Sequence, residues 1–159
     1  MAVKIANLNS NCISAKEVFL SNINNIPQYN QKDFYYKLHV FLSNLNIYST
    51  TDIDVIDLES RDWSNLPGYA NIFIQPETIE ECALIFHICY QNKVPITISA
   101  GKTNLTGSAT AEGGVIMSII KLKKPEIKVD VNQKEVTSPV GIPLEELRAK
   151  ILKLSNNKL

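Results

Sequence analysis

The fold of this chain is decided by the stretch Pro95-Ile96-Thr97-Ile98-Ser99-Ala100-Gly101-Lys102-Thr103-Asn104-Leu105-Thr106-Gly107-Ser108-Ala109, which is followed shortly by Gly113-Gly114-Val115-Ile116-Met117. An apolar strand is expected over residues 96–99 and a second over 115–120, with small and hydroxyl residues between them. Short side chains leave the main-chain N–H groups of such a turn accessible, and successive N–H groups form concave binding sites for anions. The stretch therefore predicts a strand–loop–strand unit whose loop can hold a phosphate.

Two familiar phosphate-binding motifs do not fit this loop. Gly101-Lys102-Thr103 resembles the end of a Walker A loop, but that motif requires a glycine five positions before Gly101, where Ile96 stands. The dinucleotide pattern G-x-G-x-x-G, counted from Gly101, would require glycines where Thr103 and Thr106 stand. The spacing therefore excludes both motifs.

The loop and its flanks resemble the FAD-linked oxidases of the vanillyl-alcohol oxidase type, in particular the glycolate oxidase and D-lactate dehydrogenase branch. The resemblance covers about half of the chain as an ordered series of motifs. In order, these are Gln75-Pro76-Glu77-Thr78-Ile79-Glu80-Glu81, Val94-Pro95-Ile96-Thr97, the loop, Glu112-Gly113-Gly114-Val115-Ile116-Met117-Ser118 and Val136-Thr137-Ser138-Pro139-Val140-Gly141-Ile142-Pro143-Leu144-Glu145-Glu146-Leu147.

This resemblance implies a PCMH-type FAD-binding subdomain whose loop grips the pyrophosphate of the cofactor. Its backbone amides and hydroxyls would bind, and Lys102 would add charge, whereas no residue is assigned as an acid, base or nucleophile. Some relatives bond a loop histidine to the flavin, and this loop has none, so the FAD is expected to be non-covalent. The ligand-facing residues implied are Gly101, Lys102, Thr103, Asn104, Leu105, Gly107 and Ser108, with Gly141 passing close behind them.

The loop departs from the family pattern at two positions. Family loops commonly carry Arg-Gly-Gly-Gly-Thr or Gly-Gly-Arg-Thr-Gly, and this chain has Ala100 and Asn104 in place of two of the usual glycines. Asn tolerates the left-handed backbone conformation better than Ala does. Strain and weaker binding are therefore expected if Ala100 adopts a positive φ. We also expect Gly107→Asp to abolish flavin binding while leaving the fold intact.

Composition and charge limit the classes of protein that are possible. The 159 residues are 45% hydrophobic, enough for the core of one ordinary domain. Sixteen basic and sixteen acidic residues give no electrostatic footprint for nucleic acid or an anionic membrane. Neither a signal peptide nor a membrane span is indicated, which predicts a cytoplasmic protein. The odd cysteine count favours a reducing compartment, and Cys82 and Cys89 are expected in the core.

The remaining pattern predicts an α+β fold, with a small mixed β-sheet flanked by helices. Residues 1–62 form a helical N-terminal lead-in, and residues 63–159 the first half of an FAD-binding domain. Helices are expected from Ser14 or Ala15 to Pro27, from Phe34 to Leu45, after Thr78 and after Pro143. Thr78 and Glu81 form a capping box. Strands are expected over 72–74 and in a hairpin of 127–131 and 135–137.

Several residues invite functional readings that the pattern does not favour. The acidic run Asp52, Asp54, Asp57, Glu59 and Asp62 alternates with apolar residues as an extended segment would, and it lacks the EF-hand spacing, so no metal site is predicted. His39 is expected to be solvated, and His87 has no adjacent nucleophile or base. The helix after Thr78 carries a second apolar side at Leu84, Ile85 and Ile88, which predicts cover from a further segment or subunit.

Two functions from different classes fit the sequence. The first is FAD binding as the N-terminal part of a flavin-dependent oxidoreductase acting on a 2-hydroxy acid such as glycolate or D-lactate. That part would be incomplete as a catalyst, with the remainder encoded separately or supplied by another subunit. The alternative is a non-enzymatic remnant or interaction module without productive flavin binding. The related enolpyruvyl-reductase branch shares the loop architecture but usually has a more serine-rich loop, and it ranks lower.

Overall fold

The computed structural model describes Pro27, Gln28 and residues 33–156, and it confirms an α+β fold with a mixed sheet. The helix expected to end at Pro27 lies outside the described residues. The helices are α2 (Phe34–Asn44), α3 (Ile53–Glu59), α4 (Ile79–Asn92) and α5 (Leu144–Leu154). The strands are β1 (Tyr48–Thr50), β2 (Ile72–Gln75), β3 (Ile96–Ser99), β4 (Val115–Ser118), β5 (Lys128–Asp130) and β6 (Glu135–Thr137).

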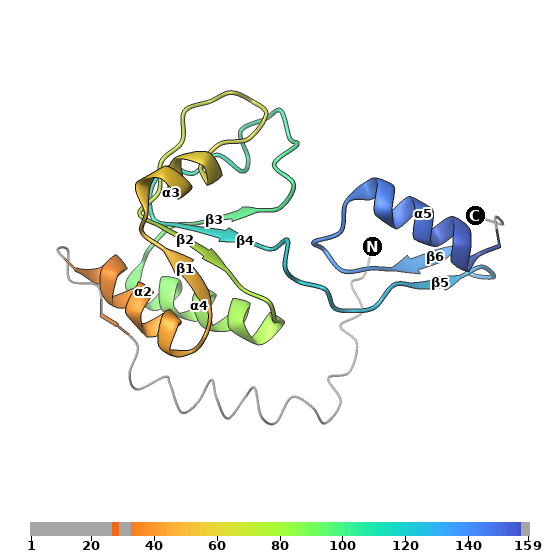
Figure 1. Cartoon of the computed structure of the whole chain (residues 1–159), viewed down its shortest axis with the longest axis horizontal. Helices are drawn as coiled ribbons and strands as arrows, with labels where there is room; N and C mark the ends of the chain where they lie inside the picture. Colours follow the sequence, from red (N-terminus) through yellow and green to blue (C-terminus); the bar gives the residue numbers. More distant parts are fainter. Residues whose placement is uncertain (1–26, 29–32, 157–159) are drawn as a thin grey trace.

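Four strands form the main sheet in the order β1-β2-β4-β3. The pairs β2–β4 and β3–β4 are parallel, and β1 pairs antiparallel with β2 at the edge. Because β3 and β4 are parallel neighbours, the chain after Ser99 must return from the carboxyl edge of the sheet to its amino edge before β4 begins. Residues 100–114 make this return without a helix, on the side of the sheet where α3 lies, whereas α2 and α4 cover the other side (Figure 1).

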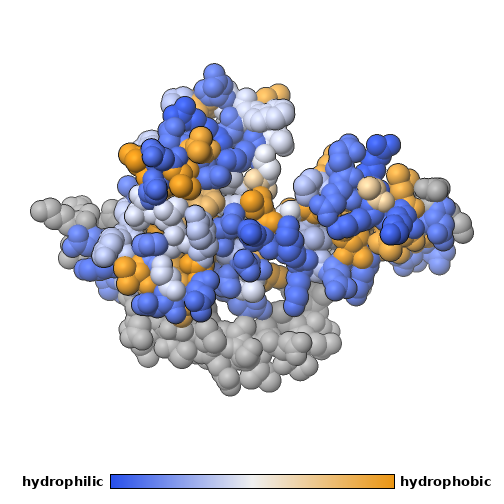
Figure 2. Space-filling view, in the orientation of Figure 1, coloured by the Kyte–Doolittle hydropathy of each residue, from blue (hydrophilic) through white to orange (hydrophobic). Residues whose placement is uncertain are grey.

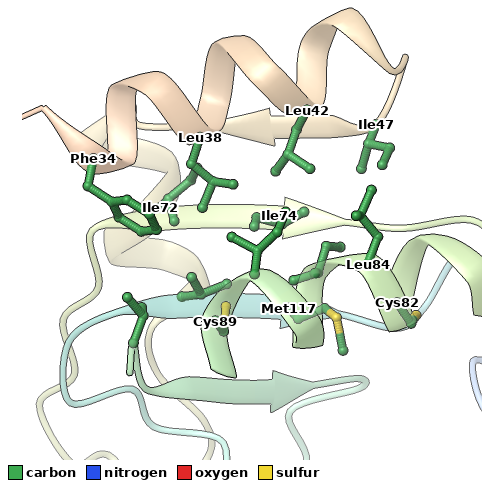
Figure 3. Close-up of a cluster of buried hydrophobic side chains, with 14 of the residues drawn as sticks. Phe34, Leu38, Leu42, Ile47, Ile72, Ile74, Cys82, Leu84, Cys89 and Met117 are labelled. Atoms are coloured by element: carbon green, nitrogen blue, oxygen red, sulfur yellow. The ribbon is translucent and has the colours of Figure 1, made fainter. Parts of the chain in front are cut away.

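The larger core lies between the sheet and the helices α2 and α4 (Figure 3). The predicted stripe of α2 is confirmed, because Phe34, Leu38 and Leu42 are fully buried there. The thiols of Cys82 and Cys89 are buried as expected, and burial raises the pKa of Cys89 to about 12. This thiol therefore stays protonated and unreactive while the core is closed.

Helix α4 begins as predicted but faces the core differently. Thr78 Oγ1 accepts a hydrogen bond from Glu81 N at 3.1 Å, and the Glu81 carboxylate accepts one from Glu77 N at 2.7 Å. The expectation that a further segment must cover Leu84, Ile85 and Ile88 is wrong, because α2 and the sheet already bury them. The apolar residues left exposed on α4 are instead Ile79, Phe86 and Tyr90. Helix α4 packs against both the sheet and α2, so it buries a broad apolar arc that includes residues of both predicted faces.

The extended segment expected over the acidic run is wrong, since residues 53–59 form α3. Asp52 caps this helix by accepting a hydrogen bond from Asp54 N at 3.0 Å, and acidic groups are favourable at a helix N-terminus. Ile56 points from α3 into a second, smaller core with Phe73, Ala111 and Ile116. This small core fixes both α3 and the end of the 100–114 segment on the sheet.

Two further features of the expected lead-in differ from the sequence pattern. Strand β1 lies within it and extends the sheet, although no strand was indicated there. His39 is half-buried rather than solvated, and its Nδ1 lies 2.9 Å from Ser49 Oγ, which joins α2 to β1. Among the described residues, no group of three His, Cys, Asp or Glu side chains is placed to hold a metal ion, and no helix is long and apolar enough to cross a membrane.

The C-terminal part forms a hairpin–helix unit, which we define as β5, β6 and α5. The hairpin is confirmed, with Val129 opposite Val136, and α5 follows the predicted span. Pro143 stands just before the helix rather than at its first position. The unit lies beyond the carboxyl end of β4 (Figure 1). None of the described residues of β5, β6 or α5 is buried.

Candidate functional site: the loop between β3 and β4

The loop predicted to hold an anion follows the carboxyl end of β3. Gly101, Thr103, Leu105 and Ser108 are exposed, whereas the other predicted loop residues are half-buried. All seven predicted loop residues lie on this connection. The structure therefore places on one loop every predicted ligand-facing residue except Gly141.

A run of main-chain donors on this loop is free to bind a ligand. Within the described part of the chain, no hydrogen-bond acceptor is found for the N–H groups of residues 101–105 and 107. The N–H groups of Thr106 and Ser108 instead donate to Asn104 Oδ1, at 3.3 and 3.2 Å. Asn104 thus folds the tip of the loop with its side chain and leaves the neighbouring donors available, as an anion-binding concavity requires.

The backbone strain considered for Ala100 does not arise. The left-handed positions of the loop are Lys102, at φ 55°, and Gly107, at φ 78°. Lys102 adopts this conformation while its ammonium donates to Glu59 Oε2 at 2.8 Å and to the Leu58 carbonyl at 3.2 Å. In this structure the Lys102 charge therefore ties the loop to the end of α3 instead of facing the free N–H groups.

A second segment, residues 59–66, supports the loop from behind, and we call it the brace. Trp63 N donates to the Lys102 carbonyl at 3.1 Å, and Ala111 N donates to the Ser60 carbonyl at 3.1 Å. The buried carboxylate of Asp62 accepts from Ser64 N at 2.8 Å and from Ala109 N at 3.1 Å. Both flanks of the loop are thereby attached to the same short segment.

Asp62 is held in its ionised form. Hydrogen bonding from the Ser64 side chain, then from the N–H groups of Ser64 and Ala109, lowers its pKa from 3.8 to about 2. A carboxyl whose pKa is lowered by folding contributes its full stabilisation above its unfolded pKa and loses it as the pH falls through the folded pKa. The stabilisation from the hydrogen bonds that the Asp62 carboxylate accepts is therefore fully present above about pH 4 and is lost as the pH falls toward 2. The sequence pattern places Asp62 in the acidic run, although Asp62-Trp63-Ser64 also has the spacing of an Asx turn.

Gly107 of the loop lies close to the brace, and Gly68 lets the chain that follows the brace pass close to Ser60. A Cβ at Gly107 would lie 2.6 Å from Leu66 Cδ1, and a Cβ at Gly68 would lie 2.0 Å from the Ser60 carbonyl oxygen. Gly107 is also left-handed, so any other residue there would be strained. Gly107→Asp would therefore strain the loop itself, and the expectation that this variant leaves the fold intact stays a prediction.

Polar groups gather below the loop at the carboxyl ends of the parallel strands. Ser99 ends β3 and is paired in register with Ser118 of β4, whose hydroxyl lies 3.5 Å from Gln75 Nε2 of β2. The Ser99 hydroxyl is buried and has no hydrogen-bond partner among the described residues. A buried hydroxyl without a partner is costly. Ser99 stands two residues before Gly101, the first residue of the run of free N–H groups.

Gly141 lies at a different place from the loop residues. A Cβ there would lie 2.6 Å from the Ile119 carbonyl oxygen and 2.7 Å from that of Ile120. The segment between β6 and α5 therefore crosses directly over the chain that leaves β4. Gly141 is required for this close approach of two backbones, and its contacts are with residues 119 and 120.

The class of protein follows from this fold and from the comparison with known families. The FAD binding domain family matches residues 70–155, which is more than half of the chain. The chain belongs to this family, and the predicted resemblance to FAD-linked oxidases is confirmed. The matched region contains the whole loop and Gly141, whereas the brace lies outside it.

Individual relatives match shorter stretches. UDP-N-acetylenolpyruvoylglucosamine reductase of Listeria monocytogenes is 33% identical over 69 residues, which are 43% of this chain and 23% of the relative. D-lactate dehydrogenase of Anaerostipes hadrus is 35% identical over 54 residues, which are 33% of this chain and 11% of the relative. The chain thus corresponds to less than a quarter of the length of either enzyme.

Solved structures show the same fold at low sequence identity. p-Cresol methylhydroxylase with bound substrate superposes with a TM-score of 0.63 at 19% identity, covering 82% of this chain and 27% of that chain. Alkyldihydroxyacetonephosphate synthase superposes with a TM-score of 0.61 at 18% identity, with the same coverage of 82% and 27%. These likenesses confirm the FAD-domain fold and extend beyond the residues that the family comparison matches.

Proposed function

We propose that this chain binds FAD non-covalently through residues 101–108, with the pyrophosphate on the free N–H groups of the loop. The single observation that carries the proposal is the run of N–H groups at residues 101–105 and 107 without acceptors among the described residues. Negative phosphate oxygens are favourable partners for such aligned donors. The loop contains neither His nor Cys, the residue types that could bond covalently to a flavin there.

The residues of the loop contribute binding and orientation in this proposal. The main-chain donors hold the phosphates, and the exposed hydroxyls of Thr103 and Ser108 offer further hydrogen bonds. When FAD is bound, it supplies the capacity to accept or give a hydride, and the protein positions it. None of these residues is proposed as an acid, base or nucleophile.

We further propose that the chain is part of a cytoplasmic flavin-dependent oxidoreductase acting on a 2-hydroxy acid. The match to D-lactate dehydrogenase, 35% identical over 54 residues, supports this substrate class. The chain corresponds to about a quarter of the flavoprotein structures that it matches. The surface that faces the substrate is therefore proposed to come from polypeptide outside residues 1–159, either continuous with the chain or in another subunit.

A second candidate is supported by the other curated relatives. UDP-N-acetylenolpyruvoylglucosamine reductases match longer stretches, of 69 to 71 residues, at 33 to 35% identity. These matches favour an enolpyruvyl reductase more than the loop sequence alone did. The two candidates share the proposed FAD site and differ only in the substrate that is oxidised or reduced.

The binding site is tested by Gly101→Asp, with Gly101→Asn as the matched control. Gly101 is exposed, its φ is not left-handed, and a Cβ there would meet only Thr103 Cγ2 at 3.9 Å, so both variants fit. The carboxylate of Gly101→Asp would repel the phosphates, whereas the amide of Gly101→Asn is neutral and of equal size. We expect wild type and Gly101→Asn to retain flavin through gel filtration and Gly101→Asp to lose it. Equal retention by all three proteins would disprove the assignment.

The substrate class is tested on the flavin-loaded protein as purified from its source. Loss of the visible flavin absorbance on anaerobic addition of glycolate or D-lactate, with formation of the 2-oxo acid, would support the 2-hydroxy acid proposal. Recovery of that absorbance when UDP-N-acetylenolpyruvoylglucosamine is added to the chemically reduced protein would support the reductase instead. A flavin that responds to neither substrate would favour a non-catalytic binding module.

A further inference from the structure

We infer that Asp62 is a positioning residue for cofactor binding: its carboxylate holds the anion-binding loop in shape by pinning the loop end at Ala109. The inference rests on the proposed FAD site. It concerns a residue outside the matched family region and outside the loop that is proposed to touch the ligand. Asp62 acts through the main chain of the loop rather than on the cofactor.

Asp62 is the side chain of the brace that binds the Ala109 end of the loop, whereas the Glu59–Lys102 ion pair holds the other end. One carboxylate oxygen binds Ser64 N inside the brace, and the other binds Ala109 N, 47 residues later in the chain. A single rigid side chain thereby fixes the distance between the two segments. The other contacts described above, from Trp63 to Lys102 and from Ala111 to Ser60, involve only main-chain atoms. Asp62 is therefore the side chain through which the attachment of the Ala109 end can be removed without altering the backbone.

The position of Ala109 explains how the carboxylate affects binding. Ala109 follows Gly107 and Ser108, and its side chain is buried against the protein. Asn104 folds the chain from 104 to 108 by accepting from Thr106 and Ser108, but no side chain of the loop fixes this folded tip to the sheet. The bond from Ala109 to Asp62 supplies that fixed point at one end, and the Lys102 contacts supply it at the other.

A direct role for Asp62 at the phosphates is not favoured. Its side chain is buried, and both of its oxygens already accept hydrogen bonds from main-chain N–H groups. An ionised carboxylate facing a pyrophosphate would repel it. Turned to the rear of the loop, the same charge strengthens the two bonds that hold the loop, because hydrogen bonds to ionised groups are stronger than neutral ones.

The test compares Asp62→Asn with Asp57→Asn in the full chain. Asp57 is an exposed carboxylate on α3 whose partner among the described residues is Arg61 of the brace, so its removal matches the change of charge without removing a contact to the loop. Two quantities are measured: amide hydrogen exchange at the hydrogen-bonded loop amides of Thr106, Ser108 and Ala109, and the FAD dissociation constant by equilibrium dialysis. Exchange at Ile116 and Met117 of β4 reports on the sheet in the same samples.

For Asp62→Asn we expect exchange at Ala109, Thr106 and Ser108 to accelerate about tenfold or more, as loss of a charge-assisted hydrogen bond implies. The FAD dissociation constant should rise by about the same factor while β4 exchange is unchanged. Asp57→Asn should leave all three unchanged. Equal acceleration in β4 and the loop would show a merely structural role and overturn the inference, as would faster loop exchange with unchanged FAD affinity.

A second variant keeps the inference falsifiable if Asp62→Asn does not fold. Ser64→Ala removes only the side-chain bond to Asp62 and the weak bond from Leu66 N to Ser64 Oγ. It should raise exchange at Ala109 in the same direction, by a smaller factor. If wild type binds no FAD, the proposed function fails, and loop exchange alone then decides whether Asp62 positions the loop. Unchanged exchange at Ala109 in both variants would overturn the inference.

Discussion

The sheet unit and the hairpin–helix unit are stabilised in different ways. The sheet unit, comprising β1 to β4 with α2, α3 and α4, has a dense core on one face and a smaller one on the other. In the hairpin–helix unit, none of the described residues of β5, β6 or α5 is buried. Hydrophobic surface gathers on that unit and over α3 in Figure 2. A two-stranded hairpin is only marginally stable by itself, so the stability of this unit depends on its contacts with the rest of the protein.

This difference explains where the candidate site lies. The loop between β3 and β4 starts at a buried serine and ends at Ala111 and Gly114, which are buried on the sheet unit. The free N–H groups are therefore carried by the better-packed half of the molecule. Binding geometry is most reproducible when a loop is fixed on rigid elements. The hairpin–helix unit meets this half at the Gly141 crossing.

The largest effect is expected from a core substitution in α4. Ile85 is 1% exposed between the sheet and α2, so Ile85→Ala leaves a cavity and should lower the free energy of unfolding by about 2–5 kcal/mol. Denaturant unfolding measures this change. Labelling of Cys89 should accelerate in parallel, because that protected thiol reacts only when the core opens. A loss below about 1 kcal/mol would mean that the sheet unit is not the well-packed half.

A smaller and more local effect is expected at the joint between the units. Gly141→Ala forces a methyl group to within 3 Å of the Ile119 and Ile120 carbonyl oxygens, an overpacking that costs about 1–3 kcal/mol. The strain should separate the hairpin–helix unit rather than unfold the sheet. Amide exchange should therefore rise at Val129 and Val136 of the hairpin and stay unchanged at Ile116. Uniform acceleration in both units would show that they unfold together.

Lys102 offers a test of the strain stored in the loop. Lys102→Ala removes the ion pair to Glu59 and keeps a left-handed non-glycine residue, whereas Lys102→Gly removes the pair and relieves the backbone. An ion pair at this exposure contributes at most about 1 kcal/mol. The glycine variant should therefore be more stable than the alanine variant by about 1 kcal/mol in denaturant unfolding. Equal stabilities would contradict a left-handed backbone at Lys102.

Sequence patterns predicted those parts of the fold that depend on local chemistry. The capping box at Thr78, the stripe of α2, the hairpin and α5 all follow from neighbouring residues, and each is confirmed. The prediction of an extended segment at α3 was wrong, because a short helix with a single buried residue, Ile56, also shows alternating apolar and polar residues. The prediction of which side of α4 is buried by this chain was wrong, because periodicity does not reveal which neighbours an element packs against.

The candidate site likewise has a part that the sequence predicted and a part that it did not. The loop residues were predictable because small and hydroxyl side chains between two strands are a local signal. The brace was not predictable, because two strands and α4 separate Asp62 from Ala109 in the sequence, and the two residues meet only in the folded chain. Ala100 and Lys102 illustrate a second limit. The family pattern pointed to strain at Ala100, whereas the folded loop places the left-handed residue two positions later, where Glu59 can hold its side chain.

The smallest effect is expected on the exposed face of α5, where it gives the sharpest test of the comparison between the units. Leu144 is 77% exposed at the start of this helix, so Leu144→Asn removes no buried surface and should change the free energy of unfolding by less than about 0.5 kcal/mol. Lys153→Asn, near the other end of α5, is a polar control. Denaturant unfolding and sedimentation of wild type and both variants would detect any departure. A loss above about 1 kcal/mol for Leu144→Asn alone, or a change in its sedimentation, would show that other polypeptide covers this face in solution. The hairpin–helix unit would then be stabilised by burial after all, at an interface rather than in a core of its own.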